Sequence, residues 1–445
     1  MSKKIVFAKL GLLTLASFAW QYDWMKLKSI RGMNDIYEDE ARLWAFIEEK
    51  VKHVFHSHGY TEIRTPILEN SNLFKRSVGD TSDIVEKEMY TFSDRNGDSL
   101  SLRPEGTASV VRAYIEHSLM QNMPIQKFYY IGPMFRHERP QKGRYRQFYQ
   151  FGIELLGLAE PLADVEVLSI QQAIIDSLEI GDVALNISSL GCKVCRPTYQ
   201  EELKAELNVV ADQLCADCQR RKDKNPLRVF DCKVPTCNEL TKDMAKMMDH
   251  LCDECSAHFA VVEKGLSALE IPYSINKSLV RGLDYYNRTA FEFVYNGDAL
   301  GSQATISAGG RYDSLVELLG GSDTPAVGFA AGIERFALIL EEKKQSLNAP
   351  VDLYCVIADA EGMPASLKIA SELRKTGLRV ELDLQMKKMK HQMKRANKLA
   401  AKYVLIIGSE EIKNDKAILK DMNKGEQQEI ALKDLKQNLL HTLVN

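Results

Sequence analysis

The sequence has no run of eighteen uncharged apolar residues, which is about the length that a bilayer-spanning helix requires. It also contains no internal repeat and no low-complexity tract, so its composition lies away from the fibrous and disordered classes. Neither sign of charge dominates, because 58 Lys and Arg stand against 61 Asp and Glu, a net charge of −3. That balance excludes a uniformly basic coat for nucleic acid. A globular protein of 445 residues remains, long enough for roughly three domains.

Cysteine is almost absent outside one segment. Eight of the nine cysteines lie within residues 192–255, which is unusual for a secreted, disulfide-stapled protein of this length. They form four close pairs, and zinc ligands come in such pairs. Two zinc sites are therefore one interpretation, and eight reduced thiols in a small core, or redox-active pairs, are the alternative. The candidate ligands are Cys192, Cys195, Cys215, Cys218, Cys232, Cys237, Cys252 and Cys255.

Hydrophobic periodicity predicts one long helix followed mainly by strands. A four-residue repeat of apolar side chains indicates a helix over 38–60. The next strand, 60–69, contains Pro66, which removes a ladder donor and predicts a position at an edge or a subunit boundary. One helix, 106–116, interrupts the strands that follow. This order favours an antiparallel sheet of the α+β type. The Asn96-Gly97 turn between the first two later strands predicts a hairpin. The later strands are predicted at 89–93, 99–103, 127–134, 147–156, 290–295 and 304–309.

The remaining segments differ in character. Residues 190–262 are rich in Cys, Lys and Asp with helical patterning, which indicates an inserted module. Residues 326–341 are predicted to form a buried helix that contains Arg335. From residue 349 the pattern is that of a βαβαβ unit with a parallel sheet. Its strands are predicted at 351–358, 378–384 and 403–408, and its helices at 365–375 and 386–401.

Cationic side chains gather in residues 132–154, between two extended apolar runs. Several guanidinium groups on one hairpin need an anionic ligand, and the planar N–H donor pairs of arginine fit phosphate oxygens. A salt-bridged hairpin on a solvated surface is the alternative, but side-chain alternation brings Arg136, Glu138, Phe148 and Gln150 to one face. The segment therefore predicts a triphosphate site. Its cationic residues are Arg136, Arg139, Lys142, Arg144 and Arg146.

Ordered motifs carry a family resemblance. Residues 132–154, with a Phe-Arg-x-Glu start, a basic loop and a phenylalanine in the return strand, resemble motif 2 of the class II aminoacyl-tRNA synthetases. Residues 61–69 resemble motif 1, and AVGFAAGIER at 326–335 resembles motif 3. The strings LRPEGT at 102–107 and RGLDYYNRTAFEF at 281–293 are similar to the histidyl-tRNA synthetase family. The resemblance extends from about Ile30 to the C-terminus.

The resemblance implies a fold and its division. The expected fold class is α+β, with a class II synthetase antiparallel-sheet catalytic domain over 25–348 and an inserted helical domain over 190–262. A C-terminal α/β anticodon-binding domain is expected over 349–445. Motif 1 in this class forms a subunit interface, so a homodimer is implied. The motifs are expected at about 40–69, 132–154 and 326–341.

The same resemblance implies a binding site for L-histidine. An amino-acid pocket needs an anion for the ammonium group and a donor and acceptor for the two imidazole nitrogens. The α-amino group would be held by Glu105, Thr107 and Gln150. Glu154 and Tyr286 would bind opposite ring nitrogens, and Tyr285 would shape the pocket. Without the surrounding Arg-Gly-Leu-Asp frame, both tyrosines would be interpreted as core aromatics. The implied histidine-binding residues are Glu105, Thr107, Gln150, Glu154, Tyr285 and Tyr286.

The implied activity is ATP-dependent attachment of L-histidine to tRNA(His) through a histidyl-adenylate. Arg281 and Arg136 would be catalytic and flank the α-phosphate. Arg335 would bind the outer phosphates, Phe148 would stack on adenine, and Glu138 would contact the same nucleotide. Mg²⁺ would bridge the phosphates. No general base for the transfer step is evident in the sequence.

Contacts to tRNA are expected at two places. Arg139 and Arg144 of the motif 2 loop would reach the acceptor end. In the second place, Lys390, Lys394 and Lys398 recur every four residues. Such a ladder is often only a solvated helix face, but residues 349–445 carry a net charge of +4 against −7 for the rest, which favours a polyphosphate contact. The opposite, apolar stripe is predicted to be Met386, Met389, Met393, Ala396 and Ala400.

Residues 1–24 allow two interpretations. Lys3 and Lys4 precede an apolar run and a small-x-small pattern at 17–19, which together resemble a signal peptide. Alternatively, the segment is a start-site extension and translation begins at Met25. ATP and tRNA are cytoplasmic substrates, so we favour the second interpretation and expect a cytoplasmic protein with no membrane partner.

A different function with the same core is a non-catalytic paralogue, the regulatory subunit of ATP phosphoribosyltransferase in histidine biosynthesis. The resemblance implies that such a protein would lack the anticodon-binding domain and tolerate loss of the ATP-binding arginines. Arg136, Arg281, Arg335 and the module over 349–445 are all present. These features favour the ligase.

Overall fold

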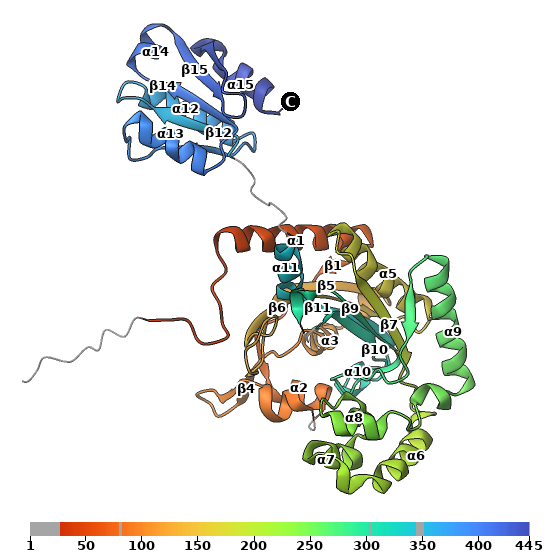
Figure 1. Cartoon of the computed structure of the whole chain (residues 1–445). Coiled ribbons are helices and arrows are strands. Elements are labelled where there is room, and N and C mark those ends of the chain that lie inside the picture. Colours follow the sequence, from red (N-terminus) through yellow and green to blue (C-terminus); the bar gives the residue numbers. More distant parts are fainter. Residues whose placement is uncertain (1–26, 80–81, 302–303, 344–350, 445) are drawn as a thin grey trace, which may run out of the picture. The chain divides into compact units, whose positions relative to one another are not determined.

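The computed structural model describes residues 27–79, 82–301, 304–343 and 351–444, so the leader expected over 1–24 lies outside the described residues. The chain forms two compact units, one mainly from residues 47–343 and the other mainly from the residues after 343 (Figure 1). Within the described ranges, none of the helices has the length and apolar character needed to cross a membrane.

An eight-stranded sheet lies at the centre of the first unit, in the order β1-β5-β6-β11-β10-β9-β7-β8. All pairs from β5 to β7 are antiparallel, and only the outermost strands, β1 and β8, run parallel to their neighbours. The predicted antiparallel α+β fold is confirmed. The strands are β1 (Thr61–Glu62), β5 (Gln126–Phe135), β6 (Gln147–Leu156), β7 (Val183–Ser189), β8 (Tyr273–Ile275), β9 (Asn287–Tyr295), β10 (Thr305–Arg311) and β11 (Ala326–Gly332).

Strand β11 shows that the helix predicted over 326–341 was wrong in its first half. Residues Ala326–Gly332 pair with β6 on one side and β10 on the other, and only Ile333–Glu342 form a helix, α11. A short run of small apolar residues does not distinguish a buried strand from a buried helix. Small residues allow close packing in this strand. At position 328 only glycine fits, because a Cβ atom there would lie 2.1 Å from Oε2 of Glu154.

Two helices cover opposite faces of the sheet near β5. On one face, α1 (Glu38–Ser57) places the Phe55 ring 5.0 Å from the ring of Tyr129. Alternate residues of a strand point to opposite faces, so Tyr130 packs with α3 (Thr107–Glu116) on the other face. The predicted amphipathic helix is confirmed, since all four of its repeating positions are buried: Leu43, Ile47, Val51 and Phe55.

The strand predicted over 60–69 is split at Pro66. Its first part is β1, at an edge of the large sheet. Its second part is β2 (Leu68–Asn70), at an edge of a three-stranded sheet with the order β2-β4-β3. Strands β3 (Thr91–Ser93) and β4 (Ser99–Leu102) form the hairpin predicted around the Asn-Gly turn. Both parts lie at sheet edges, as a residue without a backbone N–H requires.

The insertion after β7 is helical. Its last helix, α9 (Asp253–Ala268), packs against α5 (Leu162–Ser177), where a Cβ atom at Gly265 would lie 2.6 Å from Val165. The part that leaves the core therefore spans about 190–252. Its elements are α6 (Arg196–Val209), η2 (Ala211–Gln213), α7 (Ala216–Lys224), η3 (Pro226–Asp231), α8 (Pro235–Thr241) and η4 (Met247–His250).

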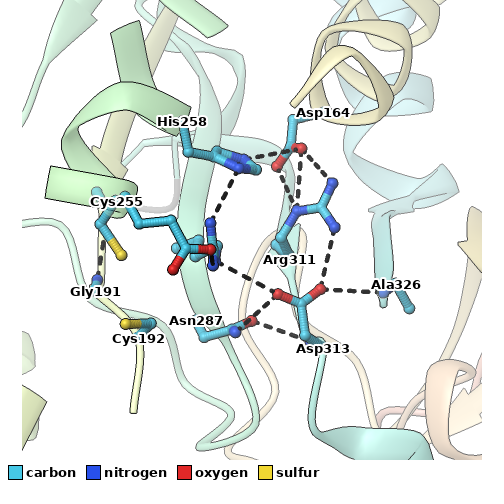
Figure 2. Close-up of polar contacts among 12 residues, drawn as sticks. Asp164, Gly191, Cys192, Cys255, His258, Asn287, Arg311, Asp313 and Ala326 are labelled. Carbon is cyan, nitrogen blue, oxygen red and sulfur yellow. Dashed lines mark hydrogen bonds and ion pairs between the residues drawn. The ribbon is translucent and has the colours of Figure 1, made fainter. Parts of the chain in front are cut away.

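A buried ion network joins β10 to these two helices (Figure 2). Nη2 of Arg311, a side chain with no exposed surface, donates to Oδ2 of Asp164 at 2.5 Å, and its Nη1 donates to Asp313 at 3.1 Å. Nε2 of His258 lies 3.3 Å from the same Asp164 oxygen. Burial by itself would raise the pKa of Asp164, but Arg311 and His258 hold that pKa below its ordinary value.

The second unit is a mixed sheet with the order β13-β12-β14-β15-β16. Its first three strands are parallel and confirm the predicted βαβαβ order, whereas β15 and β16 add an antiparallel hairpin that the sequence analysis did not predict. The elements are β12 (Leu353–Ile357), α12 (Met363–Arg374), β13 (Val380–Leu382), α13 (Met389–Lys398), β14 (Tyr403–Ile407), α14 (Ser409–Lys413), β15 (Lys416–Asp421), β16 (Gln427–Ala431), η6 (Leu432–Asp434) and α15 (Leu435–Val444).

The buried face of α13 differs from the predicted methionine stripe. Met386 and Met389 are 40% and 44% exposed, whereas Gln392 has no exposed surface. The Gln392 amide pairs with the end of β12: Nε2 donates to the Ile357 carbonyl at 2.7 Å, and Oε1 accepts from the Ile357 N–H at 3.0 Å. A polar residue can lie in this core because its amide nitrogen donates two hydrogen bonds, the second to the Lys387 carbonyl at 2.6 Å, and its oxygen accepts one.

Candidate active site

A cavity of about 300 Å³ lies over the first unit's sheet. Residues from motifs 2 and 3 and from both family-specific strings line it. The structure thereby brings together predicted residues from distant parts of the chain: Glu105, Thr107, Arg136, Glu138, Arg144, Phe148, Gln150, Arg281, Tyr285, Tyr286 and Arg335.

The pleat of β6 explains how motif 2 reaches the cavity. Phe148 and Gln150 alternate along the strand and point to the cavity side, opposite Met134 and Gly132 of β5. Arg136 follows the end of β5, and its Nε donates to the Pro104 carbonyl at 2.9 Å. Its guanidinium carbon lies 5.3 Å from the centre of the Phe148 ring. The guanidinium therefore lies over the aromatic ring, and together the two groups offer a plane for a base and a positive charge for a phosphate.

The cavity is strongly cationic beside α11. Arg335 of α11 donates from Nε to the Gly143 carbonyl at 3.3 Å and from Nη1 to the Thr305 carbonyl. Burial, followed by the positive charge of Arg144, lowers the pKa of Arg335 to about 10. Arg144 itself pairs with Glu138 at 3.1 Å. An anion bound here would offset the unfavourable proximity of the two guanidinium groups.

Arg281 also lines the cavity. Its Nη1 forms an ion pair with Glu292, which the sequence analysis did not single out, and its guanidinium carbon lies 5.7 Å from the Tyr286 ring centre. Nε of Arg281 and Oε1 of Gln150 are buried and have no hydrogen-bond partner among the described residues. Buried polar atoms are normally paired, so both atoms are available to a ligand.

Glu154 lies beneath the cavity rather than among its lining residues. Its side chain has no exposed surface. Oε1 accepts from the Thr107 hydroxyl at 2.7 Å, and Oε2 accepts from the Tyr312 hydroxyl. Burial raises the pKa of Glu154 to about 8, although the two hydroxyl groups oppose that rise. Tyr312 was missed by the sequence analysis, since an isolated tyrosine outside any motif carries no signal.

Glu105 holds the start of α3. Its carboxylate accepts from the backbone N–H of Thr107 at 2.6 Å and of Ala108 at 2.9 Å, which satisfies donors that a helix N-terminus leaves unpaired. Burial raises the pKa of Glu105, and these backbone bonds act in the opposite direction. The two backbone bonds thus fix the orientation of the Glu105 carboxyl group at one wall of the cavity.

Arg103, in the same LRPEGT string, was also missed. It is 6% exposed, and its Nε donates to the Pro133 carbonyl at 2.9 Å while Nη1 donates to the Thr65 carbonyl at 2.9 Å. One buried guanidinium therefore ties the motif 1 segment to motif 2. Only its place in the family-specific string could have signalled it.

The expected tRNA contacts other than Arg144 do not line the cavity. Arg139 is exposed on the motif 2 loop. Lys390, Lys394 and Lys398 are exposed on α13 of the second unit, as a basic ladder requires. Their role in binding stays a prediction.

An antiparallel sheet whose motif 2 and motif 3 arginines converge on one polar cavity defines the catalytic core of a class II aminoacyl-tRNA synthetase. The family model described as histidyl-tRNA synthetase matches residues 32–336, and one described as an anticodon binding domain matches residues 351–442. The chain belongs to the histidyl-tRNA synthetase family.

Known proteins of this family resemble the chain over almost its whole length. A histidine–tRNA ligase of Syntrophotalea carbinolica is 48% identical over 416 residues, which are 94% of this chain and 99% of the relative. The apo crystal structure of S. aureus histidyl-tRNA synthetase is 37% identical and superposes with a TM-score of 0.80, covering 93% of this chain and 99% of that one. A Bacillus halodurans structure, titled ATP phosphoribosyltransferase regulatory subunit/histidyl-tRNA synthetase, is 19% identical with a TM-score of 0.61 over 86% of this chain and 98% of that one, and it shows the shared fold alone.

Proposed function

We propose that the protein is a histidine–tRNA ligase, which uses ATP to attach L-histidine to tRNA(His) through a histidyl-adenylate. One observation carries the proposal: three arginines and all of the histidine-recognition groups except Glu154 line a single cavity. Arg136, Arg281 and Arg335 provide positive charge for a triphosphate. Glu105 provides negative charge for the α-ammonium group, and Tyr286 provides a hydroxyl for the imidazole.

In the first step the histidine carboxylate attacks the α-phosphate and pyrophosphate leaves. Charge builds on the α-phosphate oxygens, so catalysis consists of positioning and electrostatic stabilisation. Arg136 and Arg281 flank that phosphate, and Arg335 holds the outer phosphates. Phe148 stacks on adenine beside Arg136, with Glu138 on the same nucleotide.

The amino acid is held at the other end of the cavity. Glu105, Thr107 and Gln150 bind its α-amino group, with the unpaired Oε1 of Gln150 as one acceptor. Tyr285 shapes the pocket. Glu154 and Tyr286 bind the two ring nitrogens, and Glu154 reaches its guest by exchanging the hydrogen bond from Thr107. A site built on paired polar groups rejects analogues that lack the ring nitrogens.

Magnesium ions fit the donor set of the cavity. Carboxylate oxygens are suitable ligands for Mg²⁺, which commonly binds through one or two carboxylates and substrate phosphates. Glu138 and Glu292 both line the cavity. Bound Mg²⁺ supplies neutralisation of phosphate charge, whereas orientation of histidine and ATP comes from the protein side chains named above.

In the second step the terminal ribose of tRNA(His) attacks the adenylate carbonyl. Arg139 and Arg144 approach the acceptor end, and Lys390, Lys394 and Lys398 contact phosphates near the anticodon. This assigns catalysis to residues 25–348 and anticodon binding to residues 349–445. The insertion, predicted over 190–262, leaves the catalytic core over about 190–252. Since ATP and tRNA are cytoplasmic substrates, the proposed site of action is the cytoplasm.

The proposed assembly is a homodimer formed through motif 1. Ile67, which precedes β2, and Leu68, its first residue, are 42% and 40% exposed. Exposed apolar side chains at a sheet edge favour association. Light scattering of the purified chain would give the mass of two copies if this is correct. The alternative regulatory-subunit function is disfavoured, because the chain keeps the ATP-binding arginines and the C-terminal unit that such a protein would not need.

The test of the proposed function is pyrophosphate exchange dependent on histidine. Arg281→Ala should slow exchange by about 10²–10³-fold, the usual effect of losing one donor to a developing oxyanion, and leave tRNA affinity nearly unchanged. Arg95→Ala, in the exposed turn between β3 and β4, is the matched control and should exchange at the wild-type rate. Wild-type exchange in Arg281→Ala would refute the assignment.

A further inference from the structure

We propose that the helical insertion binds two zinc ions, each through four cysteine thiolates. The cysteine spacing in the sequence does not say which pairs combine, but the fold does. One group consists of Cys192, Cys195, Cys252 and Cys255, and the other of Cys215, Cys218, Cys232 and Cys237. Within each group all four Sγ atoms lie within 4.8 Å of one another.

The sulfur separations fit a tetrahedral zinc ion. With Zn–S bonds of about 2.3 Å, neighbouring ligand atoms of a tetrahedron stand about 3.8 Å apart. In the first group Cys192 lies 3.8 Å from both Cys195 and Cys252, and Cys195 lies 3.8 Å from Cys255. In the second group Cys215 and Cys232 are also 3.8 Å apart.

Backbone N–H groups point at the sulfur atoms in both groups. The amide of Val194 donates to Cys192 at 3.4 Å, and the amide of Val234 donates to Cys232 at the same distance. The Cys215 amide donates to Cys237 at 3.3 Å. Such bonds stabilise negative charge on sulfur and orient the ligands of a metal. Thiols that only fill a core would not need them.

Other uses of eight cysteines fit these positions less well. A disulfide requires a separation of about 2.05 Å, and all nine cysteines are free. The cysteines of a multi-iron cluster surround several iron and sulfide atoms. The sulfur atoms of each group here are too close together to enclose such a cluster. A single iron ion accepts the same tetrahedral set of sulfur ligands, so the choice between iron and zinc belongs to the experiment.

The first site closes the base of the insertion. Cys192 and Cys195 follow β7, where the chain leaves the sheet, and Cys252 and Cys255 begin α9, where it returns. Gly191 has a φ of +65°, and a Cβ atom there would lie 2.9 Å from the Cys195 sulfur. In Figure 2 this glycine, Cys192 and Cys255 lie beside the network of His258 and Arg311. A bound ion would anchor the insertion to that network.

The second site lies farther along the insertion. Cys215 precedes α7 and Cys218 lies in its first turn, whereas Cys232 follows η3 and Cys237 lies in α8. Their ligation closes a loop that contains η3. The elements around it are short, and metal binding commonly provides the folding free energy that such small modules lack.

The experiment is elemental analysis of the full-length protein, purified under reducing conditions without a chelator. We expect two zinc ions per chain. Cys192→Ser with Cys195→Ser should leave one, as should Cys215→Ser with Cys218→Ser, whereas Cys355→Ala, a buried cysteine of β12, should keep two.

X-ray absorption at the zinc edge keeps the proposal testable if a double variant does not fold. It should report four sulfur neighbours at about 2.3 Å in the wild-type protein. A metal-free wild-type chain, one zinc per chain, iron in place of zinc, or disulfides detected by intact mass would each overturn the proposal. None of these readouts depends on ligase activity, so the proposed function can fail or succeed separately.

Discussion

Arg228 of the insertion donates a hydrogen bond from Nη1 to the backbone carbonyl oxygen of Arg281, at 2.9 Å. Arg228 lies in η3 and is 6% exposed. Its Nε lies 3.9 Å from Asp284, which also accepts from Asn225 at 2.9 Å. The insertion thus contacts the segment that carries a proposed catalytic arginine and both pocket tyrosines.

This contact predicts that Arg228 positions Arg281. Arg228→Ala should lower kcat of histidine-dependent pyrophosphate exchange about tenfold or more, because a buried hydrogen bond of a charged group contributes about 1.5–3 kcal/mol and about 1.4 kcal/mol is a factor of ten. KM for ATP and histidine should change less, since the loss falls on the transition state. Arg228→Lys, which keeps a donor, should recover part of the rate. Unchanged kcat in Arg228→Ala would contradict this role.

Glu154 predicts a dependence of stability on pH. Its pKa rises from 4.5 to about 8 on folding because of burial. Between these values the folded state keeps a proton that the unfolded chain releases, so the free energy of unfolding should fall as pH rises, by at most about 1.4 kcal/mol per pH unit. Glu154→Gln cannot titrate and should flatten that decline.

The measurement is the thermal unfolding midpoint of both proteins across this pH range. Glu49→Gln, on the exposed side of α1, is the control and should follow the wild-type curve. If Glu154→Gln and the wild type decline in parallel, the buried carboxyl is not the titrating group.

The lysine ladder of α13 predicts a change in the salt dependence of tRNA binding. Replacing Lys390, Lys394 and Lys398 by Ala should reduce the slope of log affinity against log salt by roughly 0.7–0.9 for each phosphate that the variant no longer neutralises.

A triple variant of Lys413, Lys424 and Lys433, exposed lysines of the same unit, removes the same charge elsewhere. It should keep more of the wild-type slope. Equal slopes for the two triple variants would argue against a direct phosphate contact by α13.

The pair of Arg311 and Asp164 predicts a large loss of stability. Both side chains have no exposed surface. Arg311→Met would remove the positive charge that most stabilises the buried Asp164 carboxylate. Breaking a buried pair in this way typically costs about 3–5 kcal/mol. Urea unfolding followed by circular dichroism would measure it. The control is Lys277→Met, which removes a solvent-exposed partner of Asp249 and should unfold close to the wild-type midpoint. An Arg311→Met midpoint equally close to the wild type would rule out the proposed importance of the network.

Several features of the molecule were predictable because their signals are local. The four-residue repeat of α1 and the Asn-Gly hairpin between β3 and β4 depend on short-range backbone preferences. The side-chain alternation of β6 predicted that Phe148 and Gln150 share a face, and both line the cavity. The order of the synthetase motifs along the chain indicated the family.

Other features depended on contacts between distant residues. Small side chains over 326–332 are compatible with a helix or a strand. This segment forms a strand because it pairs with β6 on one side and with β10 on the other. The role of Glu154 as a histidine ligand stays a prediction, and its position beneath the cavity depends on hydrogen bonds from Thr107 and Tyr312, 47 and 158 residues away.

By itself, the sequence determined the family, the main elements and the identity of the charged groups, because helix and strand periodicity and motif order are written along the chain. Only the tertiary structure decided which cysteines stand together and that Arg228 reaches Arg281. Both depend on how helices pack across tens of residues, and packing of distant segments leaves no periodic trace in one sequence.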